Sequence, residues 1–405
     1  MNDESIDTII VNHTTESQDL GMTRNDPSPP THPALTFATF PHFRLRNRIA
    51  VAPMSRVSTA GDGRATEAML RYYASFAEGG FGLVLTEGTY TDLAHSQAYG
   101  QQPGIATDAQ AAAWSPVVRA VHDAGAKIVL QLMHAGAISQ ENPHREGTLG
   151  PSAILPNGEK MPDYGGSGPF AMPRAMTDEH IAEVVDGFTR AAVRAREVGF
   201  DGVEIHGANG YLLDQFLTTY TNARADRYGG SVANRVRLTA DVVQDALRAV
   251  GPGFTVGVRL SQTKVNDAEY RWPGGAEDAE VIFGALRSAG AHYIHIAGEG
   301  GDWMETARFA NGETITGVAR RVTGLPVLAN GGLGEPAKMA HVLTEGHADV
   351  VSIGRAALAN PDWPRRLARG EPFERFDHAM IHPFASLENA ERWRGSVFGL
   401  RAPNA

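Results

Sequence analysis

Three polar side chains lie within six residues at the end of an apolar run, in segment 204–212. His206 and Asn209 can each donate a hydrogen bond to an oxygen atom, and Tyr211 carries a proton that it can release. Alone, His206 would more often be a buried core histidine and Asn209 a helix cap. Together, two oxygen-binding groups and one proton donor at a strand end indicate chemistry on a carbonyl-bearing substrate.

Two later strand ends are rich in glycine. Asn330, Gly331 and Gly332 follow one apolar run, and Gly354 with Arg355 follows another. In barrels of parallel strands, the loops after the last two strands often bind phosphate through backbone N–H groups. One such glycine would be an ordinary turn residue, but the repeated pattern and the added cation favour a phosphate site.

Gln131 and Arg259 end two further apolar runs. A phosphate site beside amide-like groups fits flavin mononucleotide (FMN). Gln131 could pair with the polar edge of the flavin ring, and Arg259 could lie beside the ring nitrogen that becomes negative on reduction. A structural ion pair is the alternative for Arg259. We expect these strand ends to be poor in carboxylates, which suits an anionic cofactor better than a divalent cation.

A metal-dependent hydrolase is the competing kind of enzyme. His134 and His206 could begin a metal site, but His292 and His295 lie three residues apart on a strand and therefore face opposite sides. The sequence has no His-Glu-x-x-His motif and no cysteine, which excludes thiolate ligands, disulfides and iron–sulfur clusters. We predict no metal.

Eight apolar runs alternate with helical patterns and must position these side chains. Continuous apolar strands indicate a parallel sheet buried on both faces, and eight strand–helix repeats predict a (β/α)₈ TIM barrel, an α/β fold. A doubly wound sheet is disfavoured because no Gly-x-Gly-x-x-Gly follows the first run. The predicted strands are residues 49–53, 81–87, 127–132, 202–206, 255–260, 292–296, 326–330 and 349–354.

Three parts are expected along the chain. Residues 1–33 form a polar, proline-containing tail predicted to be disordered, residues 34–372 form the barrel, and residues 373–405 form a C-terminal segment. The long stretch 135–176 is rich in Gly and Pro, is predicted to be non-helical, and is expected to cover the substrate.

The charge and the hydrophobic pattern of the sequence exclude several classes of binding partner. The net charge of −10 argues against a nucleic-acid binder. No apolar run approaches the ~18–20 residues that span a membrane, and the N-terminus does not resemble a signal peptide. We expect a cytoplasmic protein, either a monomer or a homo-oligomer, that acts on small molecules.

From about residue 35 to about residue 369, the sequence resembles the Old Yellow Enzyme family of FMN-dependent ene-reductases. The resemblance rests on segments 47–56, 206–211, 224–231 and 234–235 and on the glycine-rich strand ends. It implies that His206 and Asn209 bind the carbonyl or nitro oxygen of the substrate, and that Tyr211 protonates its α-carbon. Met133 stands in the substrate pocket where many relatives carry Trp or Ala. Ser55 stands where relatives carry a Thr or Cys that tunes the flavin. In some relatives the C-terminal tail reaches a neighbouring subunit, so the resemblance implies a subunit interface for residues 373–405.

The resemblance also implies non-covalent FMN and a set of contacts to it. These are Ala52, Pro53, Met54, Ser55, Gly88, Gln131, His206, Arg259, Asn330, Gly331, Gly332, Gly354 and Arg355. We expect a ping-pong reaction in which NADPH or NADH reduces the flavin, and an α,β-unsaturated ketone, aldehyde, imide or nitroalkene then reoxidises it. A flavin-binding isomerase or sensor without this turnover is the alternative, and the intact Tyr211 argues against it.

Overall fold

The computed structural model describes residues 32–144, 147–298 and 301–398. These residues belong to one compact unit that begins at His32. The predicted tail, residues 1–33, lies outside the described residues except for its last two positions.

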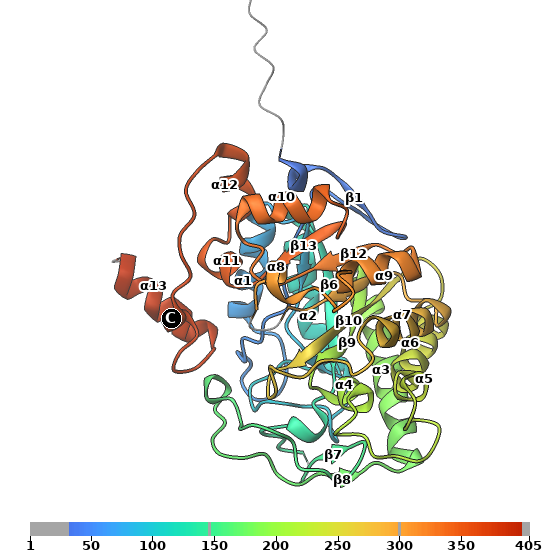
Figure 1. Ribbon diagram of the computed structural model, residues 1–405. Helices are drawn as coiled ribbons and strands as arrows, with labels where there is room; N and C mark the ends of the chain where they lie inside the picture. Colours follow the sequence, from blue (N-terminus) through green and yellow to red (C-terminus); the bar gives the residue numbers. More distant parts are fainter. Residues whose placement is uncertain (1–31, 145–146, 299–300, 399–405) are drawn as a thin grey trace, which may run out of the picture. The chain divides into compact units, whose positions relative to one another are not determined.

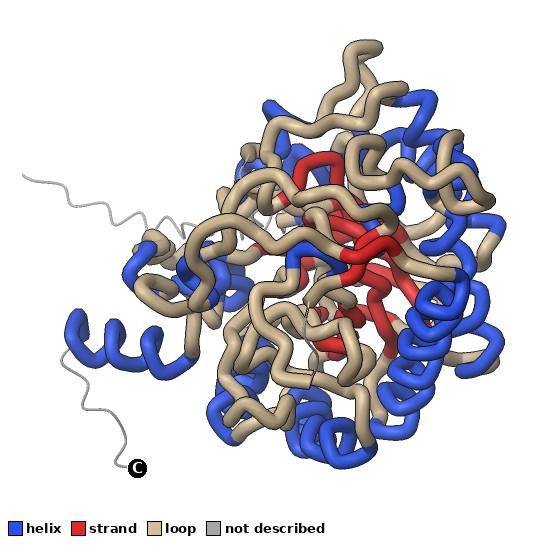
Figure 2. Tube along the Cα trace, turned by 90° about the horizontal axis from the view of Figure 1, so that it is seen from below, coloured by secondary structure: helices blue, strands red, loops and turns tan. Residues whose placement is uncertain are grey.

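A closed barrel of eight parallel strands forms the centre of this unit (Figures 1 and 2). Neighbouring strands follow the order β4-β3-β13-β12-β11-β10-β9-β6, and pairing of β4 with β6 closes the ring. The TIM barrel prediction is therefore confirmed. The strands are β3 (Ile49–Val51), β4 (Leu83–Leu85), β6 (Lys127–Met133), β9 (Gly202–Asn209), β10 (Thr255–Lys264), β11 (Ile294–Ile296), β12 (Val327–Ala329) and β13 (Val350–Ile353).

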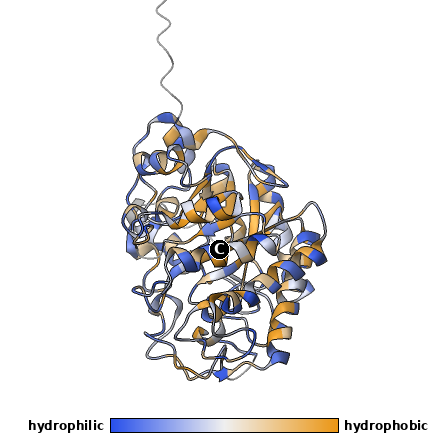
Figure 3. Ribbon diagram, turned by 45° about the vertical axis from the view of Figure 1, so that its right-hand side comes forward, coloured by the Kyte–Doolittle hydropathy of each residue, from blue (hydrophilic) through white to orange (hydrophobic). Residues whose placement is uncertain are grey.

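Helices surround the strands because their apolar faces pack on the outside of the barrel. In Figure 3 the central strands are mainly orange, whereas the surrounding helices carry many blue, hydrophilic residues. Thr107 and Thr177 begin two helices with capping boxes, and Gly199 ends one of them in the left-handed conformation. The helices of the ring are α1 (Glu67–Glu78), α2 (Asp108–Asp123), α3 (Asp178–Val198), α6 (Arg237–Val250), α7 (Ala276–Ser288), α9 (Ile315–Thr323), α10 (Pro336–Thr344), α11 (Arg355–Ala359) and α12 (Trp363–Arg369). No helix among the described residues is long and apolar enough to cross a membrane.

A short hairpin closes the amino-terminal end of the barrel. It consists of β1 (Ala38–Thr39) and β2 (Arg44–Leu45), which pair antiparallel. Phe40 and Phe43 between the two strands are buried against side chains that point into the barrel, such as Leu83 and Val129. The interior is therefore packed at this end, and an opening is left at the carboxyl ends of the strands.

The remaining elements belong neither to the barrel strands nor to the ring of helices. The long stretch 135–176 has no α-helix among its described residues, in agreement with the prediction. It contains η2 (Gly136–Ile138), β7 (Leu149–Gly150), η3 (Pro162–Tyr164) and β8 (Arg174–Ala175). The other short elements are η1 (Pro33–Leu35), β5 (Thr89–Tyr90), α4 (Leu212–Leu217), α5 (Val232–Arg235), α8 (Trp303–Thr306) and η4 (His378–Met380), and the last helix is α13 (Leu387–Phe398).

Candidate active site at the mouth of the barrel

Two adjoining cavities lie at the carboxyl ends of the strands. The larger has a volume of about 510 Å³ and the smaller about 290 Å³. Pro53, Met54, Arg259, Asn330, Arg355 and Phe376 line both, so the two cavities form one continuous space. Strand ends far apart in sequence therefore meet here, as barrel geometry requires.

Every residue predicted to bind cofactor or substrate lines this space. The larger cavity is lined by Ala52, Pro53, Met54, Arg259, Asn330, Gly331, Gly332, Gly354 and Arg355. The smaller cavity is lined by Pro53, Met54, Ser55, Gly88, Gln131, Met133, His206, Asn209, Tyr211, Arg259, Asn330 and Arg355. The structure thus brings the whole predicted set together. The glycine-rich strand ends line the larger cavity, and His206 lines the smaller one.

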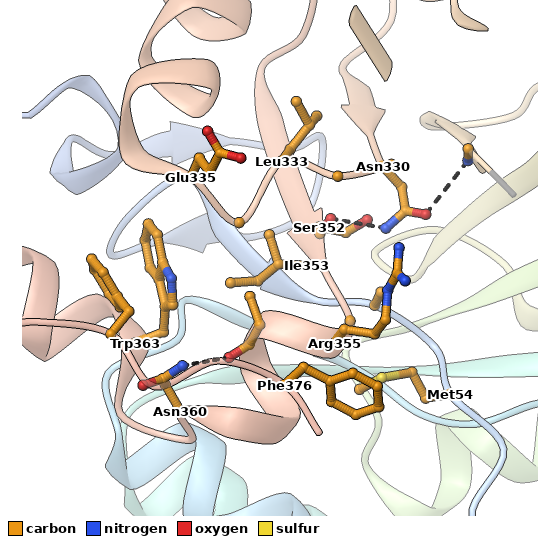
Figure 4. Close-up of a pocket in the computed structure, with 18 of the residues that line it drawn as sticks. Met54, Asn330, Leu333, Glu335, Ser352, Ile353, Arg355, Asn360, Trp363 and Phe376 are labelled. Atoms are coloured by element: carbon orange, nitrogen blue, oxygen red, sulfur yellow. Dashed lines mark hydrogen bonds between the residues drawn. The ribbon is translucent and has the colours of Figure 1, made fainter. Parts of the chain in front are cut away.

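The glycine-rich end is shaped by a turn after β12. Gly331 has φ 122° and Gly332 has φ 63°, values that disfavour any residue with a Cβ. A Cβ on Gly331 would also lie 3.2 Å from the Cα of Gly298. The side-chain amide of Asn330 donates to the carbonyl of Ser352 at 2.9 Å, which ties the ends of β12 and β13 together (Figure 4).

Arg355 begins α11 at the same end of the cavity. Its side chain is exposed, and its guanidinium forms no hydrogen bond or ion pair with any of the described residues. Figure 4 shows how Arg355, Asn330 and Ser352 lie around the larger cavity. A cation without a protein counter-ion, beside a glycine turn with accessible backbone, is suited to bind an anionic group.

The predicted oxygen-binding pair lies at the end of β9. His206 is opposite Arg259 of β10 in the strand register, and Arg259 donates to Asn209 Oδ1 at 3.4 Å. Asn209 has φ 64°, a left-handed conformation, and its backbone N–H donates to the hydroxyl of Ser261 at 2.8 Å. This bond and the contact with Arg259 fix the direction of the Asn209 amide.

His206 is a neutral group in this setting. Burial and the positive charge of Arg259 lower the pKa of His206 to about 3. Its Nδ1 atom is buried and has no hydrogen-bond partner among the described residues. Since a buried polar atom without a partner is costly, this atom is suited to a ligand in the cavity.

Tyr211 is held by a second tyrosine that the sequence analysis did not select. The hydroxyl oxygens of Tyr211 and Tyr99 are 2.5 Å apart, and both side chains are buried. Burial raises the pKa of Tyr211 to about 12, so the phenol keeps its proton at neutral pH. The ring of Tyr164, from η3 in the long stretch, packs on Tyr99 at 4.5 Å and lines the smaller cavity.

A buried carboxylate of β9 lies beneath the mouth. Glu204 accepts hydrogen bonds from Gln131 at 2.8 Å and Tyr293 at 3.0 Å, and it contacts His295 Nδ1 at 2.9 Å. Burial would raise the pKa of Glu204, but His295 and the charge of Arg259 lower it to about 2. Glu204 lines neither cavity, and its charge interacts with that of Arg259 while its side chain orients the Gln131 amide.

Glu87 is a second buried carboxylate, at the end of β4. It accepts hydrogen bonds from the backbone of Arg56 at 2.8 Å and Val57 at 3.1 Å, and from the hydroxyl of Tyr73 at 3.1 Å. Burial raises the pKa of Glu87 to about 7. These bonds hold the segment that carries Ser55 over the cavity.

The structure does not assemble the competing metal site. His134 is buried, and its Nε2 lies 3.8 Å from Asp92 Oδ2, but none of the described residues joins it or His206 as a third ligand. Within the described parts of the chain, one group of His, Asp and Glu side chains is close enough to share an ion. This group consists of Asp163, His378 and His382, outside the barrel mouth.

Comparison with known proteins identifies the family. Residues 38–374 match the NADH:flavin oxidoreductase / NADH oxidase family, whose cofactor is FMN. The chain belongs to the Old Yellow Enzyme family. The Old Yellow Enzyme homologue from Zymomonas mobilis has a similar structure, with a TM-score of 0.76 and 32% identity over 85% of this chain and 94% of that one. Morphinone reductase in complex with tetrahydroNAD has a TM-score of 0.75 and 32% identity, over 87% and 94%.

Curated relatives of the chain include proteins of Oryza sativa subsp. japonica and Thermoanaerobacter brockii. The 12-oxophytodienoate reductase 1 of Oryza sativa subsp. japonica is 34% identical over 86% of this chain and 90% of its own length. The NADH oxidase of Thermoanaerobacter brockii is 32% identical over 82% of this chain. The chain spans 50% of the length of that NADH oxidase.

The residues at the mouth fit the cofactor of the family. The joined cavities offer a glycine turn that a Cβ would fill, the Arg355 cation at one end, and a buried His206 nitrogen at the other, and neither Arg355 nor this nitrogen has a partner within residues 32–144, 147–298 and 301–398. These are the features required to hold an anionic phosphate at one end and a polar ring at the other.

Proposed function

We propose that the protein is an ene-reductase that uses NADPH or NADH to reduce the activated C=C bond of α,β-unsaturated carbonyl compounds or nitroalkenes. The observation that carries the proposal is the convergence of His206, Asn209 and Tyr211 on one cavity beside the flavin-sized space. When bound, FMN supplies hydride transfer, taking a hydride from the nicotinamide and passing one to the alkene in two successive ping-pong half-reactions.

The proposed cofactor contacts divide between the two ends of the space. Gly331, Gly332, Gly354 and Arg355 would hold the phosphate, while Gln131 and Arg259 would face the polar part of the ring. Ala52, Pro53, Met54, Ser55, Gly88, His206 and Asn330 complete the proposed set. Arg259 stays balanced by the buried Glu204 anion, so its charge is held in place without leaving an unpaired ion in the interior.

His206 and Asn209 would polarise the substrate. Each presents an N–H donor at the end of β9, and two donors on a carbonyl or nitro oxygen draw electron density from the conjugated C=C bond. His206 is neutral because of its low pKa, so it acts as a hydrogen-bond donor without giving up its proton. The β-carbon of the alkene thereby becomes the electrophilic position.

Tyr211 would protonate the α-carbon. Its Oη carries the proton at neutral pH because burial raises its pKa to about 12. The contact with Tyr99 holds the hydroxyl in position and stabilises the oxygen when the proton leaves. General acid catalysis of this kind contributes roughly 10²–10⁴-fold in rate.

Two segments outside the barrel would shape the substrate pocket. Tyr164 comes from the long stretch 135–176, and Phe376, Ile381 and Ala385 come from the C-terminal segment, and all four line the smaller cavity. We propose that stretch 135–176 covers the substrate and that the C-terminal segment contributes one wall. A place for the C-terminal segment at a subunit interface remains a prediction.

The first test is the visible absorption spectrum of the purified protein before and after a simple phenol is added. A flavin band and a new long-wavelength charge-transfer band are expected, and His206→Ala or Asn209→Ala should weaken phenol binding. A protein that stays colourless after incubation with FMN would overturn the proposal.

The second test separates the two half-reactions. Tyr211→Phe should slow alkene reduction by roughly 10²–10⁴-fold and leave flavin reduction by NADPH nearly unchanged. Equal losses in the two half-reactions would remove the proton-donor role. Steady NADPH consumption that requires an enone distinguishes an ene-reductase from a flavin-binding isomerase or sensor.

A further inference from the structure

Three potential metal ligands from two distant segments meet on the surface beside the substrate pocket. Asp163 lies in η3 of the long stretch, and His378 and His382 lie at the C-terminal segment. Their ligand atoms all fall within 4.8 Å of one another. Asp163 Oδ1 is 3.2 Å from His382 Nδ1, and Asp163 Oδ2 is 3.9 Å from His378 Nε2.

The three ligand atoms lie farther apart than the ligands of a bound zinc ion, by an amount that side-chain movement can supply. With metal–ligand distances near 2.0–2.2 Å, neighbouring ligand atoms lie about 3.3 Å apart. The distance from His382 to Asp163 Oδ1 is close to this value, and the distance from His378 to the other oxygen, Asp163 Oδ2, is about 0.6 Å longer. All three ligand atoms, now within 4.8 Å of one another, have to move to this spacing around an ion. Both histidines are exposed, so a side-chain rotation can supply this shift and an ion can reach the site from solvent.

The backbone that carries the histidines is fixed before any ion binds. The N–H of His382 donates to the carbonyl of His378 at 3.1 Å, which places the two imidazoles one helical turn apart. The amide of Asn389 donates to the carbonyls of Ala379 and His382 at 3.0 and 3.1 Å. The two rings are nearly parallel, with centroids 5.8 Å apart.

The third ligand is held against this turn by a backbone contact. The N–H of Ala385 donates to the carbonyl of Asp163 at 2.8 Å, so the long stretch and the C-terminal segment are already in contact here. In Figure 1 the green part of the long stretch approaches the red C-terminal segment below α13. Tyr164, next to Asp163, lines the smaller cavity, as does Ala385.

We propose that Asp163, His378 and His382 form a binding site for a divalent transition-metal ion of the zinc type, with water completing the coordination. Two imidazoles and one carboxylate with an open position are a ligand set that suits zinc. Because the ligands come from both segments, the ion links the proposed substrate cover to the C-terminal wall of the pocket. Zinc binding at this site does not depend on the reaction proposed for the barrel.

The test is a calorimetric titration of Zn²⁺ into the full-length, FMN-loaded protein without a polyhistidine tag. One ion per chain is expected at this site. His378→Gln, His382→Gln and Asp163→Asn should each weaken zinc binding by at least about tenfold, since loss of even an outer partner of a metal ligand costs 10–100-fold. Zinc binding that none of the three substitutions weakens would overturn the site, as would no binding at all.

His122→Gln is the matched control. His122 contacts Asp201 at 2.8 Å, but Lys127 occupies the other oxygen of this carboxylate at 2.7 Å. Among the described residues no third metal ligand lies near this His–Asp pair, so loss of His122 should leave zinc affinity unchanged.

Hydrogen exchange measures the link between the segments. Zn²⁺ should slow amide exchange in residues 161–166 and 378–385 of the wild-type protein, and not in His382→Gln. Zinc binding without slower exchange in either segment would overturn the proposed link.

Discussion

Replacing Tyr99 with phenylalanine removes one hydroxyl from the buried pair that holds the proposed proton donor. The hydroxyl of Tyr99 is 2.5 Å from that of Tyr211, and this hydrogen bond lowers the pKa of Tyr211 against the larger opposing effect of burial. Without the bond, the pKa of Tyr211 rises further and the phenol becomes a weaker acid. The ring of Tyr99 is kept, so its packing on Tyr164 is preserved.

The size of the effect follows from the energy of one hydrogen bond. A neutral buried hydrogen bond contributes about 0.5–1.5 kcal/mol, and about 1.4 kcal/mol corresponds to a tenfold change in rate. Protonation of the substrate should therefore slow by about twofold to tenfold in Tyr99→Phe. This loss is much smaller than the roughly 10²–10⁴-fold expected for Tyr211→Phe, which removes the acid itself.

Stopped-flow absorbance resolves the two half-reactions. Flavin reduction by NADPH should keep its wild-type rate in Tyr99→Phe, while reoxidation by a simple cyclic enone slows. Tyr90→Phe is a control, because it removes a buried hydroxyl that bonds Gln110 at 2.6 Å and does not line the smaller cavity. The reasoning is refuted if reoxidation is unchanged in Tyr99→Phe, or if both half-reactions slow equally.

Four further outcomes are expected. The pKa of Glu87 is raised to about 7 from an ordinary 4.5, so the folded state binds this proton more tightly than the unfolded state. The free energy of unfolding should therefore fall by on the order of 3 kcal/mol as pH rises from about 4.5 to about 7, and urea titrations of Glu87→Gln should not show this fall. Glu204→Gln removes a buried anion that accepts hydrogen bonds from Gln131 and Tyr293 and contacts His295, and it should lower the free energy of unfolding by on the order of 3 kcal/mol. A loss below about 1 kcal/mol in denaturant titrations would contradict this role of the anion. Gly331→Ala puts a Cβ on a residue with φ 122° and should weaken FMN binding about tenfold in a fluorescence titration, and undiminished affinity would count against this turn as the phosphate site. The pKa of His206 is about 3, so the affinity for phenol should show no change from ionisation of this residue between about pH 5 and pH 8. A change in phenol affinity within that range that is lost in His206→Asn would show that the imidazole becomes charged there.

The sequence was sufficient to predict the barrel and the residues at its mouth, for a physical reason. Apolar runs and helical periods are local signals, and a closed parallel barrel brings the carboxyl ends of its strands together. The strands β9 and β10 nevertheless extend further than predicted, to Asn209 and Lys264. Polar residues continue their hydrogen-bonded ladder beyond the point where the apolar pattern ends.

The missed residues share one property, which is that their partners are distant in sequence. Tyr99 is separated from Tyr211 by 112 positions, and no periodic pattern marks the loop that contains Tyr99. Tyr164 lies in the stretch 135–176, which was predicted to cover the substrate, but the sequence did not single out any residue within it. Glu204 lies inside the most informative segment, but its partners Gln131 and His295 are on other strands, so its burial could not be seen from its neighbours.

The β1–β2 hairpin closes one end of the barrel, so the barrel interior is open at the other end alone among the described residues. Phe40 and Phe43 fill its amino-terminal end, so a molecule that reacts at the carboxyl-terminal mouth has to leave by the side at which it arrived. In the ping-pong reaction proposed above, the hydride donor and the acceptor use the same cavity and therefore compete for it. At high concentration the nicotinamide should then inhibit binding of the alkene, and the alkene should inhibit binding of the nicotinamide. The rate of turnover should pass through a maximum that depends on the ratio of their concentrations.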